Sequence, residues 1–278
     1  MQPIIICDQL FFRYQEEQEW ILHNFSLQVN KGDWIAVLGT NGSGKSTFAR
    51  MLNGLLQPES GTVTVAGYEV ADEEKIWNVR QKAGMVFQNP DHQFVAATVQ
   101  DDIAFGLENA GIERREMLQR IDEVSKRVGI EDLLTAEPHR LSGGQKQRAA
   151  IAGIIALRPD IMIFDEVTSM LDPKGRAEVM ETMKDLNRAG ISMIMITHDL
   201  EEALMADRVI FMEKGKTIRD RTVHDFFQDP DFLKTRNFTL PYFLEMQVAL
   251  KKHGVLLGNL SLSESEWVDR LCALPSEM

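Results

Sequence analysis

The sequence predicts an α/β fold built on a parallel β-sheet. Three runs are mostly apolar: Trp34–Leu38, Ile161–Phe164 and Ile191–Thr197. Such runs are typical of strands that are buried on both faces of a parallel sheet. Segments with the apolar spacing of helices lie between these runs, and strands that alternate with helices indicate a parallel α/β core.

The N-terminal part of the chain predicts further strands. Ile4–Cys7, Leu10–Tyr14 and Phe25–Val29 are short runs rich in apolar, aromatic and β-branched residues. A Lys-Gly-Asp turn then leads into the apolar run at 34–38. Gly61–Ala66 alternates between polar and apolar residues, so we expect one more strand there.

The middle of the chain predicts a mostly helical insertion at about residues 100–145. Met117–Gly129 has its apolar residues on one helical face. A second helix is expected over Gln145–Leu157, because Pro159 follows and cannot continue a helix.

The character of the sequence changes near residue 226, which divides the chain into a main domain over 1–225 and a C-terminal extension over 226–278. Phe243–Lys252 and Glu264–Leu274 are expected to be amphipathic helices. The second helix carries an apolar stripe of Trp267, Leu271 and Leu274. This extension could pack on the main domain or form a dimer contact, and the sequence favours neither.

The composition excludes a general nucleic-acid binder. The 278 residues carry a net charge of −12, whereas a protein that binds the phosphate backbone needs a basic surface. Cys7 and Cys272 lack metal-ligand spacing, which favours reduced, incidental thiols. No apolar run reaches the ~20 residues that span a bilayer, and the N-terminus lacks a signal-peptide pattern. We therefore expect any membrane role to depend on partner proteins.

A glycine-rich loop directly follows the apolar run at 34–38 and matches the pattern GxxxxGK[ST]. Apolar residues at helical spacing follow it, so the loop has the strand–loop–helix context of a true phosphate loop. Backbone N–H groups at the start of that helix can cradle the β-phosphate of ATP. Lys45 can reach the β- and γ-phosphates, and the Ser46 hydroxyl can bind Mg²⁺. The candidate nucleotide-binding residues here are Gly39, Thr40, Asn41, Gly42, Ser43, Gly44, Lys45, Ser46 and Thr47.

Two carboxylates end the apolar run at 161–164. Asp165 can hold Mg²⁺ directly or through water, and Glu166 is placed to polarise the attacking water. An isolated Asp-Glu pair after a strand is usually a solvated loop, but a phosphate loop upstream makes the catalytic interpretation the stronger one.

The pentapeptide Leu141–Gln145 reads LSGGQ. Together with the phosphate loop, it gives the chain a resemblance to the nucleotide-binding subunits of ABC transporters over residues 1–225. The resemblance implies an ABC-type ATPase core with a small antiparallel β subdomain, a helical signature subdomain and a C-terminal helical extension. It also implies two cassettes that close around ATP, with Ser142, Gly143, Gly144 and Gln145 of one reaching the nucleotide held by the other.

Further positions match motifs of that family. Gln88 matches the glutamine that senses the γ-phosphate and the metal, and His198 matches the switch histidine that contacts the γ-phosphate. Ser169–Asp172 matches the loop that crosses the dimer interface. Tyr14 matches the aromatic residue that stacks on adenine, although it could instead belong to the core. Val167 departs from the proline that the family commonly has.

The segment 87–106 is more specific, beginning FQNPDHQF. With Leu141–Ile151 and the extension, it resembles the first of the two paralogous ATPases of energy-coupling factor (ECF) transporters, which take up vitamins and transition-metal ions. The implied partners are a paralogous ATPase, a transmembrane coupling protein and a substrate-binding membrane protein. They would hold the chain as a peripheral protein at the cytoplasmic face of the cell membrane.

Two alternatives stay open at this point. The ATPase subunit of a conventional ABC importer would share every catalytic residue named above. Asp101 and Asp102 could pair with arginines of a coupling protein, or they could be the acidic residues that favour a helix N-terminus.

Overall fold

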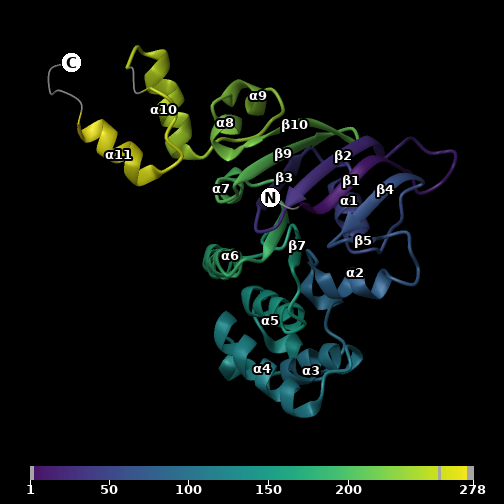
Figure 1. The fold of residues 1–278 in the computed structure, drawn as a ribbon. Coiled ribbons are helices and arrows are strands. Elements are labelled where there is room, and N and C mark those ends of the chain that lie inside the picture. Colours follow the sequence, from purple (N-terminus) through teal and green to yellow (C-terminus); the bar gives the residue numbers. More distant parts are fainter. Residues whose placement is uncertain (1–2, 256–257, 274–278) are drawn as a thin grey trace.

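A six-stranded sheet lies at the centre of the computed structural model, which describes residues 3–255 and 258–273 (Figure 1). Its strand order is β10-β9-β3-β8-β7-β6. Neighbouring strands from β9 to β6 run parallel, and β10 is antiparallel to β9. The strands are β3 (Trp34–Gly39), β6 (Ala83–Val86), β7 (Ile161–Asp165), β8 (Ser192–Ile196), β9 (Arg208–Glu213) and β10 (Lys216–Thr222).

The predicted parallel sheet is therefore confirmed. Every residue of β3, β7 and β8 is buried, as a strand covered on both faces requires. The carboxyl ends of these three neighbouring strands lie at one edge of the sheet, which places the loops after them side by side. Strands β9 and β10 were not predicted. They extend the sheet beyond β3 as a hairpin whose turn contains Lys214, at a φ of 49°.

A second, antiparallel sheet has the order β2-β1-β4-β5. Its strands are β1 (Pro3–Phe12), β2 (Leu22–Asn30), β4 (Ser60–Val65) and β5 (Tyr68–Glu69). The two strands predicted at 4–7 and 10–14 form one strand, and Tyr14 lies beyond its end. The polar interruption at Gln9 is a bulge, where φ is 48° and the backbone N–H donates to Ser26 Oγ at 2.9 Å.

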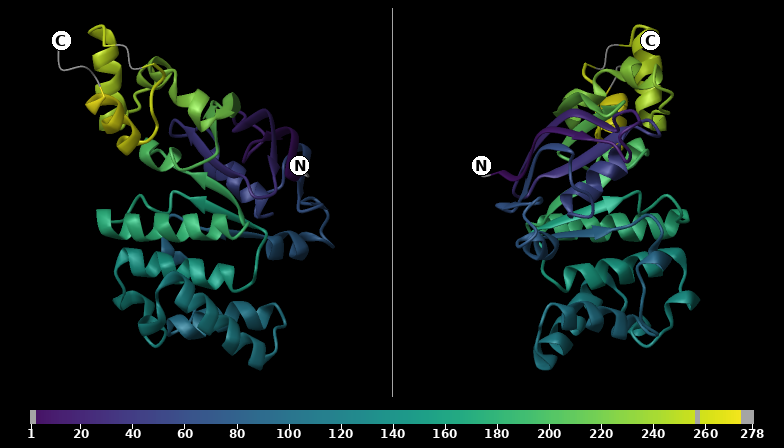
Figure 2. Two further views of the ribbon diagram at one scale, coloured as in Figure 1. Left: turned by 60° about the vertical axis from the view of Figure 1, so that its left-hand side comes forward. Right: turned by 90° about the vertical axis from the view of Figure 1, so that its right-hand side faces the viewer.

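Seven helices accompany these sheets up to residue 203: α1 (Lys45–Leu52), α2 (Ile76–Lys82), α3 (Val99–Asn109), α4 (Arg114–Val128), α5 (Gly143–Ile155), α6 (Pro173–Arg188) and α7 (Leu200–Ala203). Short 3-10 helices occur at Pro90–His92, Glu131–Leu133 and Pro138–Arg140. Figure 1 and Figure 2 show α3, α4 and α5 as a helical lobe below the central sheet. The helix predicted at 145–157 begins two residues earlier, because Ser142 caps it.

The C-terminal extension begins against the outer strands of the central sheet. The boundary predicted near residue 226 falls inside α8 (Val223–Phe227), and the extension continues with α9 (Pro230–Lys234), α10 (Tyr242–Lys252) and α11 (Glu264–Cys272). Phe226 and Phe232 are buried and pack on Phe211 of β9. Helices α10 and α11 lie farther out, at one end of the molecule (Figure 1).

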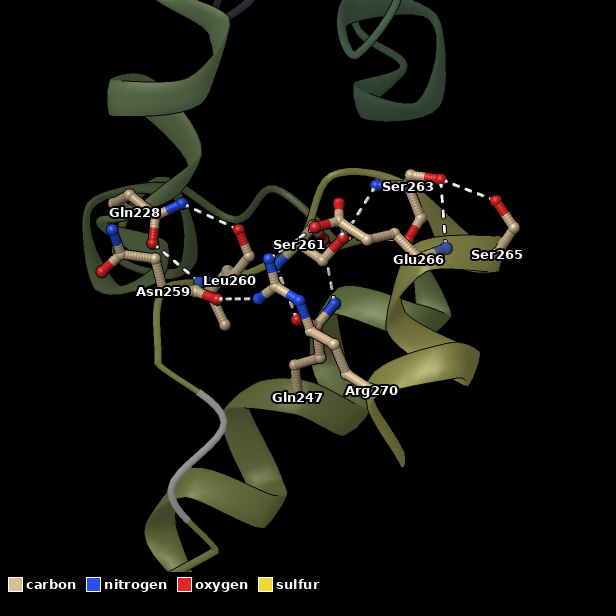
Figure 3. Close-up of polar contacts among 9 residues, drawn as sticks. All are labelled: Gln228, Gln247, Asn259, Leu260, Ser261, Ser263, Ser265, Glu266 and Arg270. Carbon is tan, nitrogen blue, oxygen red and sulfur yellow. Dashed lines mark hydrogen bonds and ion pairs between the residues drawn. The ribbon is translucent and has the colours of Figure 1, made fainter. Parts of the chain in front are cut away.

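Two glutamines hold the segment between α10 and α11 (Figure 3). The Gln247 amide donates to Ser261 O at 3.0 Å and accepts from Ser261 N at 2.8 Å. Gln228 makes the same pair of bonds with Leu260, at 3.0 and 2.9 Å.

Trp267 of the predicted stripe is buried, whereas Leu274 lies outside the described residues. None of the helices within residues 3–255 and 258–273 has both the length and the apolar character of a membrane span.

Candidate active site

The predicted catalytic residues meet at the carboxyl edge of β3, β7 and β8. The phosphate loop, Gly39–Ser46, connects β3 to α1. Asp165 ends β7 and Glu166 follows it, and His198 lies two residues beyond β8. The parallel register pairs Asp165 with Ile196, so the acidic pair and the histidine lie in neighbouring loops.

Lys45 begins α1 and is 6% exposed. Its Nζ donates to the backbone carbonyls of Gly39 at 3.0 Å and Thr40 at 3.1 Å. Among the described residues, no carboxylate lies within ion-pair distance of this ammonium. Burial lowers the pKa of Lys45, although the nearby charges of Glu166 and Asp165 oppose that shift. A buried cation held only by carbonyl dipoles suits a polyanionic ligand.

The phosphate loop packs tightly against its own fold and leaves polar groups free for that ligand. Gly44 precedes α1 with a φ of 97°, and a Cβ there would lie 2.8 Å from the Ile21 carbonyl oxygen. No side chain caps α1, so the N–H groups of its first turn remain available to an anion. Ser43 Oγ is buried within this loop without a hydrogen-bond partner, which adds one more free polar group.

Hard oxygen donors for a metal ion lie beside the phosphate loop. Ser46 Oγ donates to Asp165 Oδ1 at 2.9 Å. Burial raises the pKa of Asp165, and the Ser46 hydrogen bond opposes the shift. No cluster of three or more His, Cys, Asp or Glu side chains suited to a metal occurs in the part of the chain that the structure describes. This pair fits Mg²⁺, which is commonly bound by one or two protein groups together with substrate phosphates and water.

Glu166 adopts a strained backbone conformation at the centre of the site. Its φ is 50°, a left-handed value that is costly for a residue with a Cβ, and such strain clusters at functional sites. Its Oε2 lies 4.0 Å from Nδ1 of His198, which is exposed. Gln88 Nε2 donates to the same Oε2 at 3.4 Å and to Ser169 Oγ at 3.2 Å. Among the described residues, the Gln88 side chain is thus hydrogen-bonded to Glu166 and Ser169, and not to Ser46 or Asp165.

Tyr14 lies at the other end of the phosphate loop. It is 50% exposed, whereas Phe12 is buried, so Tyr14 is not part of the core. Its hydroxyl is 3.3 Å from Thr47 Oγ1, and its ring meets Phe12 edge to face at 5.0 Å. An exposed aromatic ring tied to the first turn of α1 is available to stack on a base.

The LSGGQ residues lie at the start of α5, on the helical lobe and apart from the phosphate loop (Figure 1). Ser142 and Gln145 form a capping box, with Ser142 N donating to Gln145 Oε1 at 2.9 Å. Gly144 packs on α6, where a Cβ would lie 2.8 Å from Gly175 Cα. The N-terminus of α5 is therefore glycine-lined, and among the described residues no hydrogen bond or ion pair joins it to the phosphate loop of its own chain.

One part of the site was not predicted from the sequence. A cavity of about 780 Å³ beside the phosphate loop is lined by Gly39–Asn41, Glu166 and His198 together with Arg236–Thr239 of the extension. Arg236 pairs with Glu213 at 3.2 Å and lies over the Phe232 ring at 4.0 Å. No sequence motif marks 236–239, because only the packing of α8 and α9 on β9 brings it there.

The acidic residues at the start of α3 make local contacts. Asp102 Oδ1 accepts from the backbone N–H groups of Val95 at 2.8 Å and Ala96 at 3.1 Å. Asp101 Oδ2 accepts from the Thr98 hydroxyl, while Thr98 caps the helix. These contacts favour the interpretation of both residues as helix N-terminal acids.

Comparison with known proteins agrees with this geometry. The ABC transporter family matches residues 22–169. The energy-coupling factor transporter ATP-binding protein EcfA1 of Bacillus subtilis is 50% identical over 277 residues, which cover 99% of this chain and 98% of that protein. The protein of the same name from Halalkalibacterium halodurans is 48% identical, with 98% of each chain covered.

Solved structures give the same assignment. CbiO1 of Clostridium perfringens, part of the ABC transporter complex cbiONQ, is 32% identical with a TM-score of 0.77 and covers 89% of this chain and 100% of its own. The ATP-binding cassette MJ0796, solved as a dimer with ADP and Pi, is 28% identical with a TM-score of 0.71, covering 79% and 98%. The likeness to ECF proteins extends over nearly the whole chain, so it favours the ECF ATPases over the ATPase subunits of conventional importers. This chain belongs to the ABC transporter family and, within it, to the ATP-binding subunits of energy-coupling factor transporters.

Proposed function

We propose that this ECF ATPase binds ATP with Mg²⁺ at the carboxyl edge of β3, β7 and β8, and hydrolyses it between two cassettes. One observation carries the proposal: Lys45, the Ser46–Asp165 pair and the Glu166–His198 pair converge at that edge. They supply a phosphate cradle, metal ligands and a carboxylate for the attacking water.

The binding half of the site consists of the phosphate loop, Lys45 and Tyr14. Helix N–H groups and the ammonium of Lys45 hold the β- and γ-phosphates, and Tyr14 stacks on adenine. Ser46 and Asp165 would hold Mg²⁺, with Gln88 as a further ligand; when bound, the ion neutralises charge on the phosphates. Gln88 also reaches Glu166, which suits a residue that reports the state of the γ-phosphate.

Glu166 and His198 form the hydrolytic half. Glu166 orients and polarises the attacking water, and His198 contacts the γ-phosphate. Because oriented donors stabilise the charge that develops on the phosphoryl group, a second cassette would add Ser142 and the N–H groups of Gly143 and Gly144 from its own α5. The separation of α5 from the phosphate loop within one chain supports this arrangement in trans.

The second cassette is a paralogous ECF ATPase, or another copy of this chain when it is isolated. The extension over 226–278 is a candidate contact between cassettes, because Tyr242 of α10 is 75% exposed and Val268 of α11 is 45% exposed. Exposed aromatic and aliphatic side chains of this kind are common at protein interfaces.

The transport role follows from the relatives. We expect a transmembrane coupling protein and a small substrate-binding membrane protein to hold this chain at the cytoplasmic face of the membrane. The transported solutes would be vitamins or other micronutrients. Each cycle of ATP binding and hydrolysis would close and open the cassette pair and so drive the membrane partners.

Affinity purification of the tagged chain from detergent-solubilised membranes of its host tests the assembly. We expect mass spectrometry to identify a second ATPase of similar size, one coupling protein and very small membrane proteins. Recovery of two large permease subunits with an extracytoplasmic receptor would contradict the ECF assembly while leaving the catalytic assignments in place.

A further inference from the structure

A buried carboxylate outside the recognised motifs connects the two loops that carry Glu166 and His198. Glu202 lies in α7 and is 4% exposed. Its Oε1 accepts from Thr168 Oγ1 at 2.5 Å, and its Oε2 accepts from Thr197 Oγ1 at 2.6 Å. Both oxygens of one side chain therefore take a hydrogen bond from a different loop of the active site.

The two threonines are close neighbours of the proposed catalytic residues. Thr168 is two positions after Glu166, and Thr197 directly precedes His198. Thr197 Oγ1 also accepts from the backbone N–H of Asp199 at 3.0 Å, so the residues on both sides of His198 are fixed to one hydroxyl. The backbone N–H of Glu166 donates to Ile196 O at 3.0 Å, which joins the same two loops from the other side.

Helix α6 supplies the counter-charge. Arg176 Nε lies 3.7 Å from Glu202 Oε1, and the same guanidinium pairs with Asp199. A buried carboxylate is costly unless hydrogen bonds and a cation compensate it, and an apolar side chain would fill the space without that cost. The network instead fixes a geometry, since two short hydrogen bonds to one rigid carboxylate define the separation of the two loops.

We propose that Glu202 is a positioning residue for ATP hydrolysis: it fixes the separation and orientation of Glu166 and His198, whose side chains lie 4.0 Å apart. Among the described residues, Glu202 makes its hydrogen bonds and ion pair with Thr168, Thr197 and Arg176 rather than with Glu166 or His198, and it does not line the cavity beside the phosphate loop. This inference rests on the proposed roles of Glu166 and His198, and the experiment below separates the two claims.

The test uses the intact complex purified with its membrane partners. Because misplacement of a catalytic group by about 1 Å can cost 10²-fold, we expect Glu202→Ala to lower kcat for ATP by about 10- to 100-fold, with KM changed by less than about 3-fold. Glu202→Gln keeps one acceptor oxygen and gains an amide N–H that a threonine hydroxyl can accept, so it should recover most of kcat. Glu201→Gln, at the exposed neighbouring position, is the matched control and should leave kcat unchanged.

A second set of variants separates positioning from simple loss of stability. Thr168→Val and Thr197→Val each remove one hydroxyl, and each should lower kcat less than Glu202→Ala does. Combining Thr168→Val with Glu202→Ala should add little to the alanine change, because the alanine already removes the hydrogen bond that the Thr168 hydroxyl donates. In a Glu166→Gln background, Glu202→Ala should still form the ATP-bound cassette pair, since binding residues are untouched. If Glu202→Ala does not fold, Thr168→Val and Thr197→Val still test the positioning role.

Two outcomes would overturn the inference. The first is an unchanged kcat in Glu202→Ala, or in both valine variants if the alanine variant does not fold. The second is a loss of ATP binding that parallels the loss of kcat, which would mark Glu202 as structural only. If Glu166→Gln and His198→Ala themselves retain normal turnover, the proposed catalytic roles fail, whatever Glu202→Ala does. If they lose turnover and Glu202→Ala does not, only the positioning role fails.

Discussion

The phosphate loop and the LSGGQ segment are the two glycine-rich elements of this chain, and they differ in how complete they are. The phosphate loop already contacts the residues with which it is expected to act. Lys45 is buried in the loop, and Ser46 Oγ donates to Asp165 Oδ1 at 2.9 Å. The LSGGQ segment begins α5 and is capped by Ser142, but among the described residues no hydrogen bond joins Ser142 or Gln145 to the phosphate loop of its own chain. We propose from this difference that one chain holds a complete binding site and an incomplete catalytic one.

Replacing the buried lysine should disrupt ATP binding at the phosphate loop. Lys45→Ala removes the ammonium that reaches the phosphates, so we expect turnover to fall by about 10²- to 10³-fold, with ATP binding strongly weakened. Binding of a fluorescent ATP analogue and phosphate release would measure the two effects. Lys126→Ala, at an exposed position of α4, is the control. ATP affinity equal to that of the parent in Lys45→Ala would contradict the cradle.

Changing the LSGGQ segment should affect turnover of the assembled cassette pair without affecting ATP binding by the isolated chain. Ser142→Ala should lower turnover of the assembled cassette pair by about 10- to 100-fold, because a donor to the other cassette's γ-phosphate is lost. ATP binding by the isolated chain should not change. The helix cap is also lost, at about 1 kcal/mol, so thermal melting must accompany the assay. Ser142→Thr keeps the hydroxyl and should retain activity. Weaker ATP binding by isolated Ser142→Ala would show that LSGGQ acts within its own chain.

Removing the exposed aromatic ring should weaken binding modestly. An aromatic stacking contact contributes about 0.5–1.5 kcal/mol, so Tyr14→Ala should raise the Kd for ATP by roughly 2- to 12-fold. Tyr14→Phe keeps the ring and loses only the hydrogen bond to Thr47, so it should bind nearly as the parent does. Isothermal titration with ATP and with inorganic triphosphate would test the assignment: equal losses for both ligands would mean that Tyr14 does not contact adenine.

The smallest effect on the nucleotide site is expected from the extension. Gln247→Leu leaves the buried N–H and C=O of Ser261 without partners, which should lower the free energy of unfolding by about 1–3 kcal/mol. Hydrogen exchange over residues 258–273 should speed up, while the Kd of the isolated chain for ATP stays the same. Glu245→Gln, exposed on the same helix, provides the comparison. Unaltered exchange in Gln247→Leu would mean that the glutamine does not hold this segment.

The sequence was sufficient for the parts of the site that follow buried strands. Apolar runs mark β3, β7 and β8, and residues directly after parallel strands must gather at one edge, so Asp165 and His198 could be placed together in advance. Glu202 could not be found in this way. It lies in the sequence Leu-Glu-Glu-Ala, which is typical of a solvated helix, and only the packing of α7 buries it.

Two further features depended on long-range packing. Gln9 is polar and interrupts an apolar pattern, so it predicts a break, but pairing with β2 and β4 on either side turns the break into a bulge. The segment 236–239 reaches the cavity beside the phosphate loop because aromatic residues of α8 and α9 anchor it on β9. Neither contact has a local sequence signal, since both join residues far apart in the chain.

The most direct test of a site shared between two cassettes is the mass of the Glu166→Gln variant by light scattering, with and without ATP and Mg²⁺. Without the carboxylate that activates water, bound ATP should persist between the cassettes. We predict a stable ATP-dependent dimer whose turnover is lower by about 10²-fold or more. A variant that stays monomeric with saturating ATP and hydrolyses it at the parent rate would contradict both the role of Glu166 and the completion of the site in trans.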